Sequence, residues 1–597
     1  MHRDLVKPIT VEEIRGALKS IKGDKAPGPD SFCSSFFQHN WDIVGQDLID
    51  AVLLFFEKGY ILKEWNSTAL TLALPIVMSQ SQSAFIKGRS IVDNVLLMHE
   101  LIRNYHRNDG SPRCAIKVGI MKAYDSVDWD FLLDTMKAME FPTIFVGWVK
   151  ECITTPKFSI MINGGLEGYF LGARDLRQGD PISPYIFLLV MEAFSSLLQW
   201  NIEAGEFTYH PKCQAQAISH VVFADDLFIL SSALEKSLHI IFQTLKDFHG
   251  FFGMQPNLLK SAIYFAGVPS TTQQELSQLL GIPVGQLPVQ YLGVPLISTR
   301  LTSSDSAVLK ERILAKIHNL KHIGAKVNWA KLCVLKNEGG LGFRSIKEWN
   351  KAVNMKHLWV ISQKADTLWV KWVHVYILRG QSLWGVQIPC EASWVIRKLL
   401  KLRDTCQEWI RLLASYWALY KRFGETMVAH RGRALQAEVS SIIDEGVWKW
   451  PRQRNRAIME IMRETPDGFL PSPSVSDTVI WTLTADGKYS AKSAWEACRH
   501  QNPVQPWHAI VWFGYGVPRW SFIEWQTVLG RLPSGDRLVS WGMVVSPQCV
   551  LCSSGMESHA HLFFDCHFSS SIWQQILSRN GITRSILPLS QELEWAL

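Results

Sequence analysis

The chain lacks a long apolar run, a secretory signal core and a paired cysteine framework. Its longest apolar stretch, Ala69–Met78, is broken by Pro75 and is shorter than the ~18–20 residues that a membrane span needs. Charge begins at the third residue, so secretion is not expected. The eleven cysteines are odd in number and mostly scattered, which favours a reducing compartment over disulfides. We therefore expect an intracellular protein with no membrane partner.

Net charge and tryptophan are scarce in the first half of the chain. The 597 residues carry 61 Lys/Arg and 54 Asp/Glu, a formal balance of +7. Residues 301–371 hold 13 Lys/Arg and five acids (13 − 5 = +8), so the rest sums to 7 − 8 = −1. Five of the 25 tryptophans precede residue 301, and four lie within the basic stretch. Such a stretch can follow a phosphate backbone, although a solvated helical face over core tryptophans is the alternative.

The texture of the sequence divides it into three predicted segments. Residues 1–300 alternate helical and strand-like patterns, residues 301–470 are basic and predicted to be helical, and residues 475–597 are rich in Trp, Cys and His. The Pro-Ser-Pro-Ser stretch 471–474 is a linker candidate. Thr10 and Glu13 form a capping-box pattern that starts a helix. Further helices are predicted for Ile91–Tyr105 and from Ser183 onward.

The most informative segment is Ile218–Leu230, in which two short apolar strands flank Asp225 and Asp226. This pattern predicts that both acids lie at the tip of a hairpin. An acidic pair in a turn is commonly only solvated, but here apolar residues flank it and no Gly or Asn makes the turn. The context favours a held carboxylate site, and paired carboxylates suit hard divalent cations, which take oxygen ligands.

Two further segments accompany the acidic pair. Cys114–Ile120 is predicted to be a strand that leads through Tyr124 into a helix, and Gly179 permits close backbone approach to a ligand. Together with other blocks in residues 10–300, these segments resemble the polymerase motifs of non-LTR retrotransposon reverse transcriptases, closest to the LINE-type elements of plants. The motifs that carry the resemblance are Lys25–Asp30, Gln82–Arg89 with Asp93 and Asn94, Arg177–Pro184, Phe223–Asp226, Pro256–Ser261 and Tyr291–Pro295.

The resemblance implies an α+β fold and a reaction. The fold would be a right-hand polymerase with fingers and an antiparallel palm sheet (1–300). A truncated thumb with a helical connector (301–470) and a small zinc-binding domain (475–597) would follow. A DNA primer 3′-hydroxyl would attack the α-phosphate of a deoxynucleotide, templated by RNA. Asp225 and Asp226 would be catalytic and hold Mg²⁺ or Mn²⁺. The nucleotide-binding residues would be Tyr124, which excludes the ribose 2′-hydroxyl, Gln178, Gly179 and Lys260. The family also implies nuclear residence.

The sequence departs from the family at the first palm aspartate. Gly119 stands at that position, five residues before Tyr124, and Asp125 is not a replacement because intact members also carry it. Losing such a ligand should cost several kcal/mol of transition-state stabilisation, on the order of 10³-fold in rate. Segments of the fingers, after Leu72, and of the thumb, within 301–324, also look absent. We interpret the chain as a degenerate, internally deleted copy and expect an impaired polymerase.

The C-terminal segment carries a metal-ligand pattern. Cys549, Cys552, His561 and Cys566 have the spacing C-x₂-C-x₈-H-x₄-C, and three thiolates with one imidazole are a common structural zinc set. His559 competes with His561 as a ligand. The surrounding sequence resembles the zinc-binding region at the C-terminus of plant non-LTR reverse transcriptases. The nearby tryptophans Trp495, Trp507, Trp512, Trp520 and Trp525 are expected to form its core rather than to stack on bases.

Three functional hypotheses remain open from the sequence. The first is a reverse transcriptase by descent whose palm is short of one Asp. The second is a nucleic-acid-binding protein without catalysis that uses the basic segment and the zinc region. The third is a retroelement relic with no function.

Overall fold

The computed structural model divides the chain into two compact units. The first unit comprises Met1–Leu301 with Lys364–Arg397, and the second comprises Thr302–Gln363 with Lys398–Leu597. The predicted boundaries at residues 300 and 470 stay predictions. The described residues are 8–21, 33–58, 77–107, 109–155, 157–162, 165–177, 180, 182–299, 311, 328–413, 443–444, 447–448 and 478–597. The Lys25–Asp30 motif, the proposed thumb region 301–324 and the 471–474 linker lie outside the described residues apart from residue 311.

A four-stranded antiparallel sheet organises the first unit. Its strand order is β4-β5-β1-β6, with β4 at His220–Phe223, β5 at Asp226–Ser232, β1 at Arg113–Val118 and β6 at Ala262–Ala266. These strands read as short apolar runs, which is typical of strands covered on both faces. β1 overlaps the strand predicted at Cys114–Ile120, beginning one residue earlier and ending two residues earlier, and β4 and β5 form the predicted hairpin.

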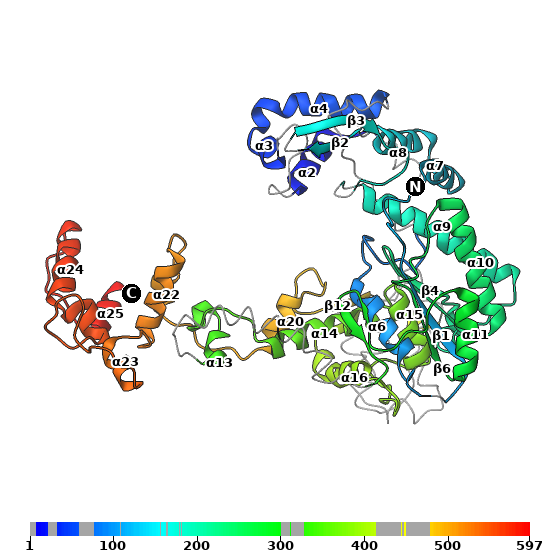
Figure 1. Ribbon diagram of the computed structural model, residues 1–597. Coiled ribbons are helices and arrows are strands. Elements are labelled where there is room, and N and C mark those ends of the chain that lie inside the picture. The colour runs from blue at the N-terminus through cyan, green and yellow to red at the C-terminus, as the bar shows by residue number, and fades with distance from the viewer. Residues whose placement is uncertain are drawn as a thin grey trace. The chain divides into compact units, whose positions relative to one another are not determined.

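Helices cover both faces of this sheet. Figure 1 shows α9, α10 and α11 along one side of β1, β4 and β6, with α6 and α15 on the other. The helices of the first unit are α2 (Val11–Ser20), α3 (Ser34–His39), α4 (Trp41–Lys58), α6 (Ile91–Ile102), α7 (Trp129–Ala138), α8 (Thr143–Thr154), α9 (Ser183–Ala204), η1 (Gln214–Gln216), α10 (Glu235–Phe252), α11 (Ser270–Leu280), α15 (Leu368–Trp372) and η3 (Val373–Leu378). Two hairpins complete it, β2 (Lys157–Ile162) with β3 (Gly165–Leu171) and β7 (Val289–Tyr291) with β8 (Val294–Leu296).

The helix starts predicted from the sequence are confirmed. The Thr10 hydroxyl accepts a hydrogen bond from the Glu13 amide, and the Glu13 carboxylate accepts one from the Thr10 amide, which completes the capping box of α2. α9 begins at Ser183 with proline in its first turn. By length and composition α9 could cross a membrane, a test that buried core helices also pass, and 61% of its most apolar window is buried.

The second unit combines part of the connector with the C-terminal region. Its elements are α13 (Trp329–Leu332), η2 (Lys336–Glu338), α14 (Ile346–Ser362), β9 (Ile410–Leu413), β10 (Ile443–Asp444), β11 (Val447–Trp448), β12 (Thr478–Trp481), α20 (Ala491–Cys498), α21 (His508–Val511), α22 (Pro518–Val528), α23 (Gly535–Ser540), η5 (His561–Asp565), α24 (His567–Arg579) and α25 (Leu589–Ala596). α16 (Trp394–Cys406) crosses the boundary between the units. The connector, predicted to be helical, also contributes β9, which pairs antiparallel with β12.

Tryptophans fill the core of the second unit, as the sequence predicted only in part. Trp495 and Trp525 are buried, at 4% and 0% exposure, and Trp507 and Trp512 are half-buried. The prediction was wrong for Trp520, which is 64% exposed. Its place near the start of α22 turns the indole away from the buried side of that helix, where Trp525 packs.

Candidate functional site

The hairpin between β4 and β5 places the two aspartates at one end of the sheet. Phe223 pairs with Asp226, so Ala224 and Asp225 alone make the turn. Ala224 adopts φ +54°, a left-handed conformation that non-glycine residues rarely take and that here replaces the glycine expected in such a turn. Asp225 is exposed and Asp226 is half-buried. The predicted hairpin-tip position of both acids is confirmed.

Strand β1 brings Lys117 and Gly119 beside the acidic pair. Val118 pairs with Leu227, and the next step of this antiparallel ladder sets Gly119 beside Asp226. The Lys117 ammonium lies 3.8 Å from Asp226 Oδ1. Burial, chiefly, and the neighbouring Asp225 raise the pKa of Asp226, while Lys117 acts against both. Sequence reasoning assigned Lys117 no role, although a lone lysine within an apolar strand was a visible signal.

Residues of the Pro256–Ser261 turn occupy the space beside Gly119, the position that corresponds to the expected first palm aspartate. The Asn257 amide donates to the Gly119 carbonyl at 2.7 Å, and the Gly119 amide donates to Ser261 Oγ at 3.1 Å. A Cβ added at Gly119 would lie 2.8 Å from Lys260 Cβ, closer than Cβ contacts occur. The backbone of Gly119 is thus engaged by the Pro256–Ser261 turn, and that turn fills the space for a side chain.

The implied nucleotide-binding residues are brought together in part. The Tyr124 ring stacks on Phe187 at 5.0 Å between centroids. Burial, chiefly, and the charge of Asp225 raise the pKa of Tyr124, which places this side chain near the hairpin tip. Lys260 is exposed and contacts the Gly119 position. Gln178 and Gly179 lie outside the described residues.

Residues 81–83 support the outer edge of the hairpin. The Val222 amide donates to the Ser81 carbonyl at 2.9 Å, and the Ala224 amide donates to Gln82 Oε1 at 3.2 Å. Asn94 Nδ2 donates to the Val222 carbonyl at 3.0 Å. Gln82 and Asn94 belong to a motif quoted from the sequence, but their contact with the hairpin spans more than 100 residues and no local pattern predicts it.

The donor set at the palm does not match a three-carboxylate metal site. The hairpin supplies two carboxylates, Asp225 and Asp226, and the third position offers only the Gly119 backbone. An ammonium, Lys117, already lies close to Asp226. Since two divalent cations need compensating negative charge, these residues provide less of it than a two-metal site requires.

The predicted zinc ligands converge in the second unit. The ligand atoms of Cys549, Cys552, His561 and Cys566 all lie within 4.8 Å of one another, a spacing that fits tetrahedral coordination by three thiolates and an imidazole. The pKa of Cys552 is lowered to about 5, and the largest cause is a hydrogen bond from the Ser554 hydroxyl. The cluster therefore favours a thiolate, which is the form that binds metal.

The competing ligand His559 is engaged elsewhere. Its Nε2 lies 2.8 Å from the Leu532 carbonyl, which can accept a hydrogen bond from it. Gly555 permits the approach of His561, because an added Cβ would lie 2.5 Å from that ring. Between the two histidines, the geometry therefore places His561 at the cluster.

Two families match the chain in the regions that hold these sites. The family described as reverse transcriptase (RNA-dependent DNA polymerase) matches residues 61–296. The family described as zinc-binding in reverse transcriptase matches residues 489–573. The chain therefore contains a reverse transcriptase domain, of mixed helices and antiparallel sheet, followed by a reverse-transcriptase zinc-binding region.

Similar proteins define the kind of reverse transcriptase. The Transposon TX1 uncharacterized 149 kDa protein of Xenopus laevis is 28% identical over 271 residues, 39% of this chain and 21% of that protein. The Pol polyprotein of the type-2 retrotransposable element R2DM of Drosophila melanogaster is 27% identical over 198 residues, which cover 33% of this chain and 18% of that protein. A putative ribonuclease H protein of Arabidopsis thaliana is 22% identical over 275 residues, which cover 42% of this chain and 44% of that protein. The two matched families and these relatives together support a non-LTR retrotransposon reverse transcriptase.

The matched region spans about a fifth of the length of the Xenopus and Drosophila proteins.

Among solved structures, apo telomerase from Candida Tropicalis truncated from its C-terminal domain aligns with a TM-score of 0.28 and 10% identity, over 45% of this chain and 47% of that one. This likeness is too slight to carry an argument. The closeness to plant elements stays a prediction.

Proposed function

We propose that this protein is an RNA-directed DNA polymerase by descent whose palm polymerises poorly. Its substrates would be an RNA template, a DNA primer and deoxynucleotides. The observation that carries the proposal is the β4-β5-β1 ladder, which sets Asp225 and Asp226 beside Gly119. The hairpin of a polymerase palm is kept, while the neighbouring strand supplies no carboxylate.

The roles follow from this arrangement. Asp225 and Asp226 would hold Mg²⁺ if it binds, and Tyr124, next to the hairpin tip, would exclude the ribose 2′-hydroxyl. Lys260 is exposed beside the same end of the sheet, where it can meet a phosphate. The Cys₃His cluster would hold Zn²⁺ as a structural ion, because four protein ligands leave no open position for a substrate.

Two assays on the full chain test the two parts of the proposal separately. Fluorescence anisotropy with a labelled DNA primer annealed to RNA should show binding that weakens with salt. Primer extension on the same hybrid with Mg²⁺ or Mn²⁺ should show little incorporation. Failure to bind the hybrid would overturn the proposal that the chain still takes an RNA template and a DNA primer, whereas robust incorporation would overturn the impairment.

A non-catalytic nucleic-acid-binding protein is the second candidate. The observation that favours it is a cluster of exposed aromatic and basic side chains in residues 328–347, which lie outside both family matches.

A further inference from the structure

Residues 328–347 form a tightly turned segment of the second unit. The Phe343 amide donates to the Leu332 carbonyl at 3.3 Å, and the Gly342 amide donates to the Val334 carbonyl at 2.8 Å. A Cβ added at Gly340 would lie 2.0 Å from the Val334 carbonyl oxygen, so only glycine fits there. These constraints return the chain onto α13 and fix the position of Phe343.

The turn places two exposed aromatic rings against each other. Trp329 and Phe343 stack with 6.1 Å between ring centroids and 19° between ring planes. Trp329 is 56% exposed and Phe343 is 50% exposed. Large exposed aromatic surface is uncommon unless a partner covers it, and a pair of near-parallel rings on the surface is suited to stacking with planar groups.

Four cations lie in the same short segment as the two rings. Lys331, Lys336, Arg344 and Lys347 are exposed, and within the described part of the chain none of them forms an ion pair with an acid. The Lys336 ammonium lies 4.5 Å from the centre of the Trp512 ring, and the Arg344 guanidinium lies 4.1 Å from that of Trp349. These two cations are therefore held in place on neighbouring rings.

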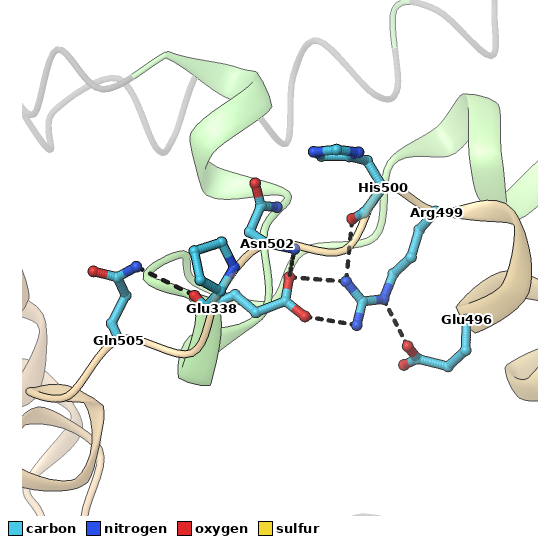
Figure 2. A network of polar contacts seen from close by, with 7 residues as sticks. Glu338, Glu496, Arg499, His500, Asn502 and Gln505 are labelled. Carbon is cyan, nitrogen blue, oxygen red and sulfur yellow. Dashed lines mark hydrogen bonds and ion pairs between the residues drawn. The ribbon is translucent and has the colours of Figure 1, made fainter.

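The single acid of the segment, Glu338, does not offset this charge. It is buried and accepts hydrogen bonds from both terminal nitrogens of Arg499, at 2.8 and 2.7 Å, and from the Asn502 amide at 3.2 Å (Figure 2). Burial acts to raise the pKa of Glu338, but these donors outweigh it and the pKa is lowered. The Glu338 charge is therefore neutralised by Arg499 and does not offset the four exposed cations.

The same network anchors the segment to the zinc-binding region. The Gln505 backbone amide donates to the Asn337 carbonyl at 2.8 Å, and Trp525 Nε1 donates to the Gly339 carbonyl at 3.0 Å. Arg499 also pairs with Glu496 at 2.6 Å. A surface fixed in this way is preorganised, so little ordering cost opposes binding.

We infer that Trp329, Lys331, Lys336, Phe343, Arg344 and Lys347, here named the basic aromatic patch, bind single-stranded nucleic acid. Bases stack on the Trp329–Phe343 pair, and the four cations meet the phosphates on either side. Exposed rings beside unpaired cations are the combination by which proteins hold single strands without reading their sequence. This site is separate from the palm and does not rest on the polymerase proposal.

Binding of fluorescein-labelled U₁₂ and dT₁₂ to the full chain tests the inference. The variant Trp329→Ala/Phe343→Ala should bind both about tenfold or more weakly than the unmodified chain, since each stacked base contributes strongly. Lys331→Gln/Lys347→Gln should lower the slope of log affinity against log salt by roughly 0.7 for each lost phosphate contact. A 12-base-pair duplex, whose bases are already stacked, should be little affected by the aromatic substitutions.

Matched controls separate the patch from general effects. Trp200→Ala removes another exposed tryptophan, 66% exposed in the first unit, and Lys398→Gln/Lys401→Gln removes two exposed lysines of α16. Both controls should bind U₁₂ as the unmodified chain does. Equal affinity of the aromatic variant and the Trp200 control would overturn the inference. So would photo-cross-linking of 5-iodouridine-substituted U₁₂ to peptides that contain neither Trp329 nor Phe343.

Discussion

Replacing Gly119 by Asp tests both the missing carboxylate and the closed space beside it. The new Cβ would lie 2.8 Å from Lys260 Cβ, so the two atoms must separate by 3.4 − 2.8 = 0.6 Å to reach ordinary contact. The Asn257 and Ser261 hydrogen bonds to Gly119 resist this movement. Overpacking of this kind costs roughly 1–3 kcal/mol, whereas the regained ligand is worth on the order of 10³-fold in rate.

Gly119→Asn is the matched control, because it crowds Lys260 equally and supplies no anionic oxygen. Single-nucleotide extension of a DNA primer on poly(rA), under single-turnover conditions, measures the difference. We expect Gly119→Asp to exceed Gly119→Asn at least tenfold, with similar losses of thermal stability in both. Equal rates for the two variants would refute the reasoning that a carboxylate at this position is what the palm lacks.

Three further predictions concern stability. Glu338→Gln leaves Arg499 with Glu496 as its remaining carboxylate partner and should cost about 1.5–3 kcal/mol of unfolding free energy; an unchanged urea midpoint would count against the network. Burial lowers the pKa of His220 to about 4, below the unfolded value of about 6.5, so the unfolded state binds the extra proton and stability falls as pH drops from 6.5 to 4. His220→Gln should remove up to roughly 3 kcal/mol of this pH dependence in urea titrations, and an unaltered pH profile would contradict it. Cys566→Ser should abolish stoichiometric zinc in atomic absorption and lower the melting temperature of the second unit to that of the chelator-treated chain; equal zinc content in the variant and the unmodified chain would contradict this site.

Local patterns in the sequence predicted those features that depend on neighbours along the chain. The capping box at Thr10, the hairpin tip at Asp225 and Asp226, and the convergence of the cysteines around Cys549 each depend on a few adjacent residues. Spacing of this kind determines local geometry directly, because turns and short hairpins leave few alternatives for the side chains that they present.

Contacts between segments that are distant in the chain could not be predicted from local sequence patterns. Lys260 reaches the Gly119 position across 141 residues of chain, and Gln82 reaches Ala224 across 142. The exposure of Trp520 depends on which face of α22 is buried, and apolar residues on both sides of that helix gave no clear period. These features depend on how the elements pack, which a single sequence does not encode as a local pattern.

The central claim is that the palm keeps its acidic hairpin but lacks the charge to use it. Its most direct test is deoxynucleotide incorporation by the unmodified chain against the Asp225→Asn/Asp226→Asn double variant, on an RNA-templated primer with Mg²⁺. We expect the two to incorporate at rates within about tenfold of each other, since the complete site is worth on the order of 10³-fold. Fast incorporation by the unmodified chain that the double variant abolishes would contradict it.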